Sequence, residues 1–356
     1  MLTNYTDNKF VLLKYLQLVF FASAILYFGS TLFVPICYGL LIAIVLYPIC
    51  RWLEQKGWPR SLAITLGLLV VVILFCALVT LLIVQANVFW RDMPELMNKL
   101  TPMLAELQTW LEETLGLTVS AQNEWWQNTL QRIGNNAGDI ARNTISATAG
   151  TFFMLFLVPV YAALFLYSRE TFVDFALSLV RPENRQQLKN VLHEVVNTYF
   201  KFIKGMLLVY LIVGILNSIG LLALGIRHAI LFGMLTAIMT IIPYVGIIVS
   251  ALLPISVAWI TKDSVWYPVG VVAVFAFVQY LEGNVIFPRV VATQLKVSTW
   301  ITLVAIIAGG LLWGVNGMIL FIPFVGILKV LFDNMPGTES LSILFERRER
   351  TKPVKK

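Results

Sequence analysis

The chain has 356 residues, of which 59% are hydrophobic and only 13% are charged, and its mean hydropathy is +0.82. A soluble domain is about 45–50% apolar and about 25% charged, and surface-to-volume scaling limits the apolar surface that a water-soluble fold of this size can bury. These values exclude an ordinary soluble protein. We therefore expect an all-α, polytopic helical membrane protein that has the lipid bilayer as its solvent.

The net charge of +7 does not indicate a nucleic-acid-binding protein. The basic residues lie in short loops between apolar runs, where they set the orientation of a protein in its membrane. The three cysteines lie in apolar segments without metal or disulfide spacing, and we interpret them as small hydrophobic residues. We expect the bilayer, and no nucleic acid, as a partner.

Uncharged apolar runs predict the transmembrane helices, because about 20 residues cross the hydrocarbon core. In chain order the runs predict about eight spans: two in 15–50, with a turn at 29–31, and one each in 61–84, 151–168, 205–226, 228–261, 264–281 and 297–328. The stretches 228–261 and 297–328 are longer than one straight helix needs. Each is either a single broken span or a re-entrant hairpin.

Loop charges predict the orientation. Under the positive-inside rule, the basic loops and the basic tail place both termini in the cytoplasm, whereas the segment 91–149 has seven acidic residues against four basic ones and suits the outside. The predicted segments are therefore transmembrane helices one to three (1–90), an extracytoplasmic amphipathic helical insertion (91–149), transmembrane helix four (150–168), a cytoplasmic amphipathic helix (169–204), transmembrane helices five to eight with broken helices (205–334) and a basic cytoplasmic tail (335–356).

Leucines recur at steps of three and four residues in the extracytoplasmic insertion, which predicts an amphipathic helix. They are Leu96, Leu100, Leu104, Leu107, Leu111 and Leu115, and Gly116 is the expected end of the helix. The helix is either a cap on the outer leaflet or a lid or oligomer contact, because exposed apolar faces usually find a partner. A second amphipathic pattern, at 186–204, predicts a basic helix on the cytoplasmic surface.

A short motif is repeated in the second half of the chain. IPYVGI at 242–247 recurs as IPFVGI at 322–327, and each copy lies in one of the two over-long stretches. Proline removes a backbone donor and glycine weakens a helix, so Pro243, Gly246, Pro323 and Gly326 are candidate helix breaks and gating positions. Matching breaks of this kind indicate the binding region of a transporter. The alternative is a kink that is repeated without function. If both stretches are single spans, the repeat is parallel.

One acidic residue follows a long apolar run. Glu282 comes after eighteen uncharged residues, and an acidic side chain at mid-bilayer costs about 2.5–3.5 kcal/mol on insertion scales, so it should face protein or water. Either it belongs to a transport pathway, or it lies at the outer interface and pairs with Arg289. The candidate pathway residues are Gln279, Glu282, Asn284 and Arg289, and Gly283 and Pro288 are further candidate helix breaks.

No enzyme constellation is visible in the sequence. The two histidines have no partners at metal-ligand spacing, and there is no phosphate loop, dinucleotide fingerprint or nucleophile elbow. We therefore expect no catalytic residues, no metal and no cofactor. Without a phosphate loop the chain alone is not an ATP-driven pump of the usual type, so uphill transport requires an ion gradient or a partner.

The runs QYLEGNVIFPRVV, GGLLWGVNGMILFIPF and IIPYVG resemble the AI-2E family of bacterial transporters, also called the PerM or UPF0118 family. The resemblance covers most of the chain. It implies an inner-membrane, multi-pass homo-oligomer that exports autoinducer-2, a quorum-sensing signal, and some members of the family resemble sodium/proton antiporters. Met206 and Ile247 depart from the residues that are usual in the family, and both lie in the half that we assign to the pathway.

Three functional hypotheses follow. The first is an exporter of a small polar metabolite such as autoinducer-2. The second is a monovalent cation/proton antiporter in which Glu282 titrates. The third is an oligomeric channel or scaffold with no coupled substrate.

Overall fold

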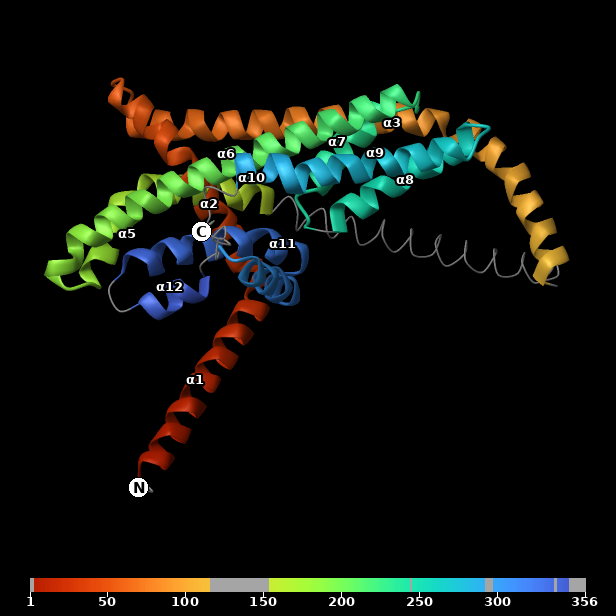
Figure 1. Ribbon diagram of the computed structural model, residues 1–356. Coiled ribbons are helices and arrows are strands. Elements are labelled where there is room, and N and C mark those ends of the chain that lie inside the picture. The colour runs from red at the N-terminus through yellow and green to blue at the C-terminus, as the bar shows by residue number, and fades with distance from the viewer. Residues whose placement is uncertain (1–2, 116–153, 244, 292–296, 336–337, 346–356) are drawn as a thin grey trace, which may run out of the picture.

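A computed structural model describes residues 3–115, 154–243, 245–291, 297–335 and 338–345, and within these ranges the chain forms helices and no β-strand (Figure 1). This confirms the predicted all-α class. The elements are α1 (Thr3–Phe28), α2 (Ser30–Gln55), α3 (Arg60–Leu115), a helix at Met154–Tyr167, α5 (Arg169–Ser178), η1 (Pro182–Asn184), α6 (Arg185–Ala223), α7 (Ala229–Met239), α8 (Val245–Thr261), α9 (Trp266–Leu281), the π-helix η2 (Glu282–Ile286), α10 (Phe287–Val290), α11 (Thr299–Asn334) and α12 (Glu339–Phe345).

Fewer helices than expected are long and apolar enough to cross a membrane. By length and composition alone there are five among the described residues, with the bent α11 counted as one, or six if the helix 154–167 and α5, which meet at 65°, form one bent span. The five are Ser30–Gln55, Arg60–Phe89, Pro182–Ala223, Trp266–Val290 and Thr299–Asn334. The sequence predicts about eight spans because hydropathy measures the length of an apolar run and not whether the run folds back.

The first over-long stretch, 228–261, folds back as a helical hairpin. The start of α7 and the end of α8 lie in one core cluster, which contains Ala229, Phe232, Val257 and Ala258, so the hairpin begins and ends on the same side. With 11 residues, α7 is about 16 Å long, roughly half of the hydrocarbon core. The stretch is therefore not the single broken span of the eight-span arrangement.

The second over-long stretch is also bent back. Inside α11 the backbone leaves helical geometry at Trp313 and at Gly314, whose φ of 58° and ψ of −137° suit glycine alone. The backbones of Gly309 and Gly317 then touch, because a Cβ on either residue would overlap the carbonyl oxygen of the other. In a straight helix these residues would be about 12 Å apart. The two arms of α11 thus form a tight hairpin.

The two copies of the repeated motif do not occupy matching positions, and the condition for a parallel repeat, that both stretches are single spans, is not met. Pro243 lies in the link between α7 and α8, and Gly246 begins α8 so close to α7 that a Cβ would overlap the Met239 carbonyl. Pro323 and Gly326 are buried inside the second arm of α11. The same sequence motif therefore forms a hairpin tip in one place and lies inside a helix in the other.

Two predicted segment boundaries fall inside continuous helices. α3 has 56 residues and passes position 90 without a break, and α6 has 39 residues and passes position 204 in the same way. α3 ends at Leu115, and the predicted stop at Gly116 lies outside the described residues, as does most of the insertion that follows. The break between α1 and α2 falls at Gly29, within the predicted turn.

The tip of the α11 hairpin joins the N-terminal helices to the rest of the molecule. Trp313 donates its indole N–H to the Leu26 carbonyl (2.8 Å) at the end of α1, and the Tyr38 hydroxyl on α2 donates to Asn316 Oδ1 (3.2 Å). Beyond this junction, α1 extends away from the other helices (Figure 1). α3 lies along α7 and α8, where Phe89 packs edge-on against Phe232.

Candidate functional site

The first candidate site is the π-helix η2, which interrupts the apolar helix between α9 and α10. A π-helical turn is rare and is frequently found at functional sites. The turn covers Glu282–Ile286 and contains Gly283. A Cβ added to Gly283 would have no other atom within 4 Å. Pro288 follows in the first turn of α10. The candidate break Gly283 thus lies within the π-helical turn, which is the only one among the described residues, and the candidate break Pro288 follows it.

The Glu282 carboxylate is the unusual group in this turn. Its side chain is half-buried, and its Oε2 atom is buried without a hydrogen-bond partner among the described residues. Tyr210 on α6 lies within electrostatic range of it. A buried, unsatisfied acceptor inside an apolar helix needs an explanation, because such groups are normally paired. Binding of a solute, a cation or a proton to the carboxylate would provide that explanation.

The structure does not gather the other candidate pathway residues around Glu282. Gln279 is exposed, Asn284 donates its side-chain amide to the Tyr280 carbonyl (3.0 Å), and Arg289 donates to the Val285 carbonyl (3.5 Å). No ion pair joins Glu282 to Arg289 in the described part of the chain. Of the four predicted residues, Glu282 alone turns toward the neighbouring helix.

Contacts along α6 show the depth of Glu282. α9 and α10 run antiparallel to α6, since Gly220 on α6 meets Val274 and a Cβ on Gly205 would lie 2.8 Å from the Val290 carbonyl. Interpolation between these two contacts puts Glu282 beside the part of α6 that carries Tyr210. That position is well inside the helix Pro182–Ala223, which is long and apolar enough to span a membrane.

The tip of the α7–α8 hairpin reaches a similar depth. Small residues let α6 and α7 approach closely, as is usual in membranes: a Cβ on Gly214 would lie 2.9 Å from Ala237, and one on Gly233 would overlap Ser218 Oγ. Continuing α7 from Ala237 to its end at Met239 brings the hairpin tip within about one turn of Tyr210 along α6. The tip and Glu282 therefore occupy similar levels on two sides of one helix.

The seam between α6 and α7 also holds buried polar side chains. Asn217 and Thr236 are fully buried. Asn217 donates to the Val213 carbonyl (2.9 Å), but its Oδ1 atom is buried with no partner among the described residues, and Thr236 bonds back to the Phe232 carbonyl (2.8 Å). Sequence reasoning missed Asn217. The feature that could have identified it is an amide side chain in the middle of an apolar run.

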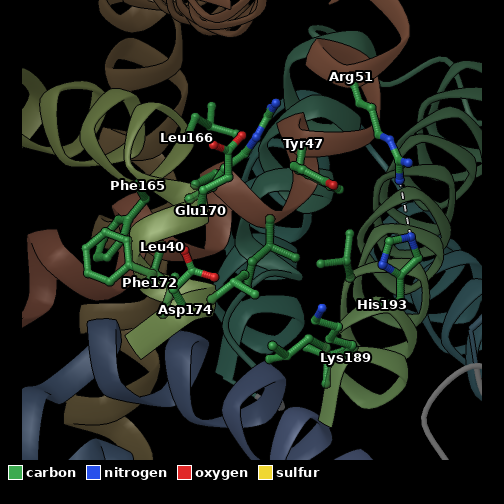
Figure 2. A pocket seen from close by; sticks show the side chains of 17 residues that line it. Leu40, Tyr47, Arg51, Phe165, Leu166, Glu170, Phe172, Asp174, Lys189 and His193 are labelled. Carbon is green, nitrogen blue, oxygen red and sulfur yellow. Dashed lines mark hydrogen bonds between the residues drawn. The ribbon is translucent and has the colours of Figure 1, made fainter. Parts of the chain in front are cut away.

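A second candidate site is a cavity of about 830 Å³ between α2, the helix 154–167, α5 and α6 (Figure 2). Apolar side chains from all four helices line it, together with charged residues from α2, α5 and α6. The charged lining residues are Arg51, Arg169, Glu170, Asp174, Lys189 and His193. Arg51 donates to His193 Nε2 (3.2 Å) across the cavity wall.

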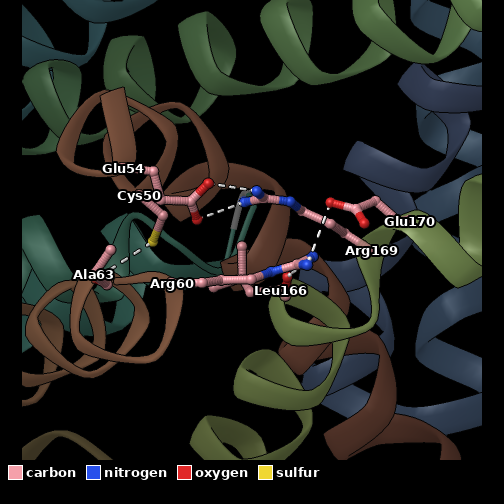
Figure 3. Close-up of polar contacts among 7 residues, drawn as sticks. All are labelled: Cys50, Glu54, Arg60, Ala63, Leu166, Arg169 and Glu170. Carbon is pink, nitrogen blue, oxygen red and sulfur yellow. Dashed lines mark hydrogen bonds and ion pairs between the residues drawn. The ribbon is translucent and has the colours of Figure 1, made fainter. Parts of the chain in front are cut away.

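Two residues that line this cavity, Arg169 and Glu170, form ion pairs with Glu54 and Arg60 (Figure 3). Arg169 donates two parallel hydrogen bonds to the Glu54 carboxylate (2.9 and 2.5 Å), and about four-fifths of each side chain is buried. Arg60 donates to Glu170 (3.3 Å) and to the Leu166 carbonyl (3.2 Å). The bidentate geometry is the strong form of an arginine–carboxylate contact. It joins the end of α2 to the bend between helix 154–167 and α5.

Sequence reasoning placed Arg60 and Arg169 in loops on one side of the membrane but did not pair either of them with an acidic residue. The sequence did contain a signal for the Glu54–Arg169 pair. Glu54 follows the second predicted span and Arg169 follows the fourth, and a charged side chain that is buried at a helix end needs a partner of opposite charge. The partners are 115 positions apart in sequence.

The AI-2E family transporter model matches residues 16–337. Two provisionally named transport proteins are similar to the chain: YrrI from Bacillus subtilis (strain 168), 26% identical over 85% of this chain and 86% of the relative, and YhhT from Escherichia coli (strain K12), 26% identical over 94% and 93%. The AI-2 transport protein TqsA from Escherichia coli (strain K12) is 24% identical over 89% of this chain and 90% of its own length.

Proposed function

The chain belongs to the AI-2E family of transporters, and on that premise we propose that it exports a small polar metabolite, with autoinducer-2 as the first candidate, across a bacterial inner membrane. The relative TqsA is named as an AI-2 transport protein. Basic residues in the loops after the second and fourth spans support a cytoplasmic location for both termini under the positive-inside rule. A homo-oligomer is part of the same proposal.

The observation that carries this proposal is the buried Oε2 atom of Glu282, which lies in a π-helical turn and has no hydrogen-bond partner among the described residues. Carboxylates inside membrane helices mark pathways for solutes and ions, because the cost of placing them there is otherwise uncompensated. In our proposal Glu282 accepts hydrogen bonds from a hydroxylated solute that passes along α6. The solute then satisfies the oxygen atom that has no partner among the described residues.

The α7–α8 hairpin is the proposed gate. Its tip ends at nearly the depth of Glu282, and it packs on α6 through Gly214 and Gly233 with little side-chain bulk between the helices. Non-helical backbone at membrane depth is tolerated where protein or a water-filled cavity surrounds it. A hairpin that enters and leaves on one side can shift without breaking a full span.

The test is a flux assay with the full chain in proteoliposomes, with autoinducer-2 as the solute and Glu282→Gln as the variant. We expect the variant to lose most of the flux, whereas Glu113→Gln, which changes an exposed carboxylate on α3, should retain it. Equal flux for both variants at every pH tested would remove Glu282 from the pathway.

A monovalent cation/proton antiporter is the second candidate function. The specific observation in its favour is that Glu282 and Asn217 each keep one buried oxygen without a partner among the described residues, and such oxygens suit a hard cation. The same vesicles, loaded with sodium and given a pH gradient, separate the two functions, since an antiporter exchanges cation for proton at a fixed ratio. A protein that moves neither solute supports the third hypothesis, a channel or scaffold.

A further inference from the structure

The cavity between α2, the helix 154–167, α5 and α6 has a polar rim and an apolar floor. Its floor includes Leu40, Ala43, Ile44, Leu166 and Val195, which are buried or half-buried. At the rim, five of the six charged or imidazole side chains are exposed. A pocket with this polarity gradient fits an amphiphile, with its headgroup in the rim and its hydrocarbon on the floor.

Two of the charged groups at the rim are already paired. Arg169 is held by Glu54, and Glu170 is held by Arg60. Asp174 and Lys189 have neither an ion pair nor a hydrogen bond with any described residue, and Arg51 is bonded only to His193 within the same range. The groups left for a ligand are therefore one carboxylate and two cations.

These groups lie on opposite sides of the cavity (Figure 2). Asp174 comes from α5, whereas Lys189 and His193 come from α6 and Arg51 from the end of α2. A purely anionic headgroup leaves Asp174 facing a negative charge. A headgroup with both a phosphate and an ammonium matches both walls, because the cations bind the phosphate and the carboxylate accepts from the ammonium.

The wall formed by α5 continues into an exposed apolar face. Phe172 and Val173 line the cavity and are 50% and 36% exposed, and Phe175 on the same helix is 63% exposed. An amphipathic helix with such a face lies in the interface of the bilayer. The cavity is thus bordered by a surface that contacts lipid, and its volume lies within the range of about 300–1,000 Å³ that ligand pockets have.

From this arrangement we propose that the cavity binds a phospholipid with an ethanolamine headgroup. Lys189 and Arg51 bind its phosphate, Asp174 binds its ammonium group, and one acyl chain starts along Ile44 and Leu40 before it enters the bilayer. The bound lipid would tie α5 to α2 beside the Glu54–Arg169 pair. The proposal does not depend on which solute the protein transports.

The experiment measures lipid binding to the purified full chain by native mass spectrometry, with phosphatidylethanolamine and phosphatidylglycerol in competition. The wild type should prefer the ethanolamine lipid. Asp174→Asn should reduce that preference about three- to tenfold and leave the binding of phosphatidylglycerol unchanged or stronger. Asp263→Asn, which removes an exposed carboxylate outside the cavity, is the matched control and should change nothing. A preference that survives Asp174→Asn overturns the assignment of the ammonium site.

Two further arms test the phosphate and the acyl chain. The double variant Lys189→Gln with Arg51→Gln should weaken the binding of both lipids, since it removes the phosphate ligands. Glycerophosphoethanolamine, which has the headgroup without acyl chains, should compete at least tenfold more weakly than the lipid. If it competes equally well, the ligand is a water-soluble phosphate ester and the lipid assignment is wrong. Size-exclusion chromatography of each variant confirms that the binding changes occur in folded protein.

Discussion

The contact between Gly309 and Gly317 allows a direct test of the folded-back α11. A Cβ on Gly309 would come closer than 3.0 Å to the Gly317 carbonyl and to the Phe321 ring, and the first of these is backbone that cannot rotate away. Overpacking of this kind typically costs about 1–3 kcal/mol. We therefore expect Gly309→Ala to lower the free energy of unfolding by at least about 2 kcal/mol.

The sign of the effect distinguishes the two possible shapes of α11. In a straight transmembrane helix Gly309 would have no such neighbour, and alanine would stabilise the helix by up to about 1 kcal/mol. The assay is equilibrium unfolding in mixed micelles with increasing fractions of a denaturing detergent. Gly283→Ala is the control, because a Cβ there meets no atom within 4 Å. A Gly309→Ala protein that is as stable as the wild type, or more stable, would refute the hairpin.

Two other contacts give predictions that the same assay checks. Glu54→Gln should lower the free energy of unfolding by about 2 kcal/mol, because it leaves Arg169 partly buried without its carboxylate. The double variant with Arg169→Gln should recover part of that loss. Additive losses would show that the pair does not interact. Trp313→Phe removes the hydrogen bond to the Leu26 carbonyl and should cost about 1 kcal/mol. It should also speed limited proteolysis near the end of α1, and an unchanged cleavage rate would contradict that role.

The sequence by itself determined the class of this protein and the position of most helices. Apolar runs are a local property, so hydropathy alone predicts helices that need lipid, and the break at Gly29 falls within the predicted turn. Glu282 was visible for the same reason, as one charge after eighteen uncharged residues. The predicted orientation of the loops rests on local charge as well.

Only the tertiary structure decided which apolar runs turn back. Hydropathy gives the same value for a residue in a span and in a hairpin, whereas the contact of Gly309 with Gly317 and the position of Gly246 against α7 exist only once the arms are packed. Charge pairing is equally non-local. In the sequence Glu54 and Arg169 are separate charges, and they become a structural contact only where two helix ends meet. Asp174, which lines the cavity nearby, has no ion pair with any described residue.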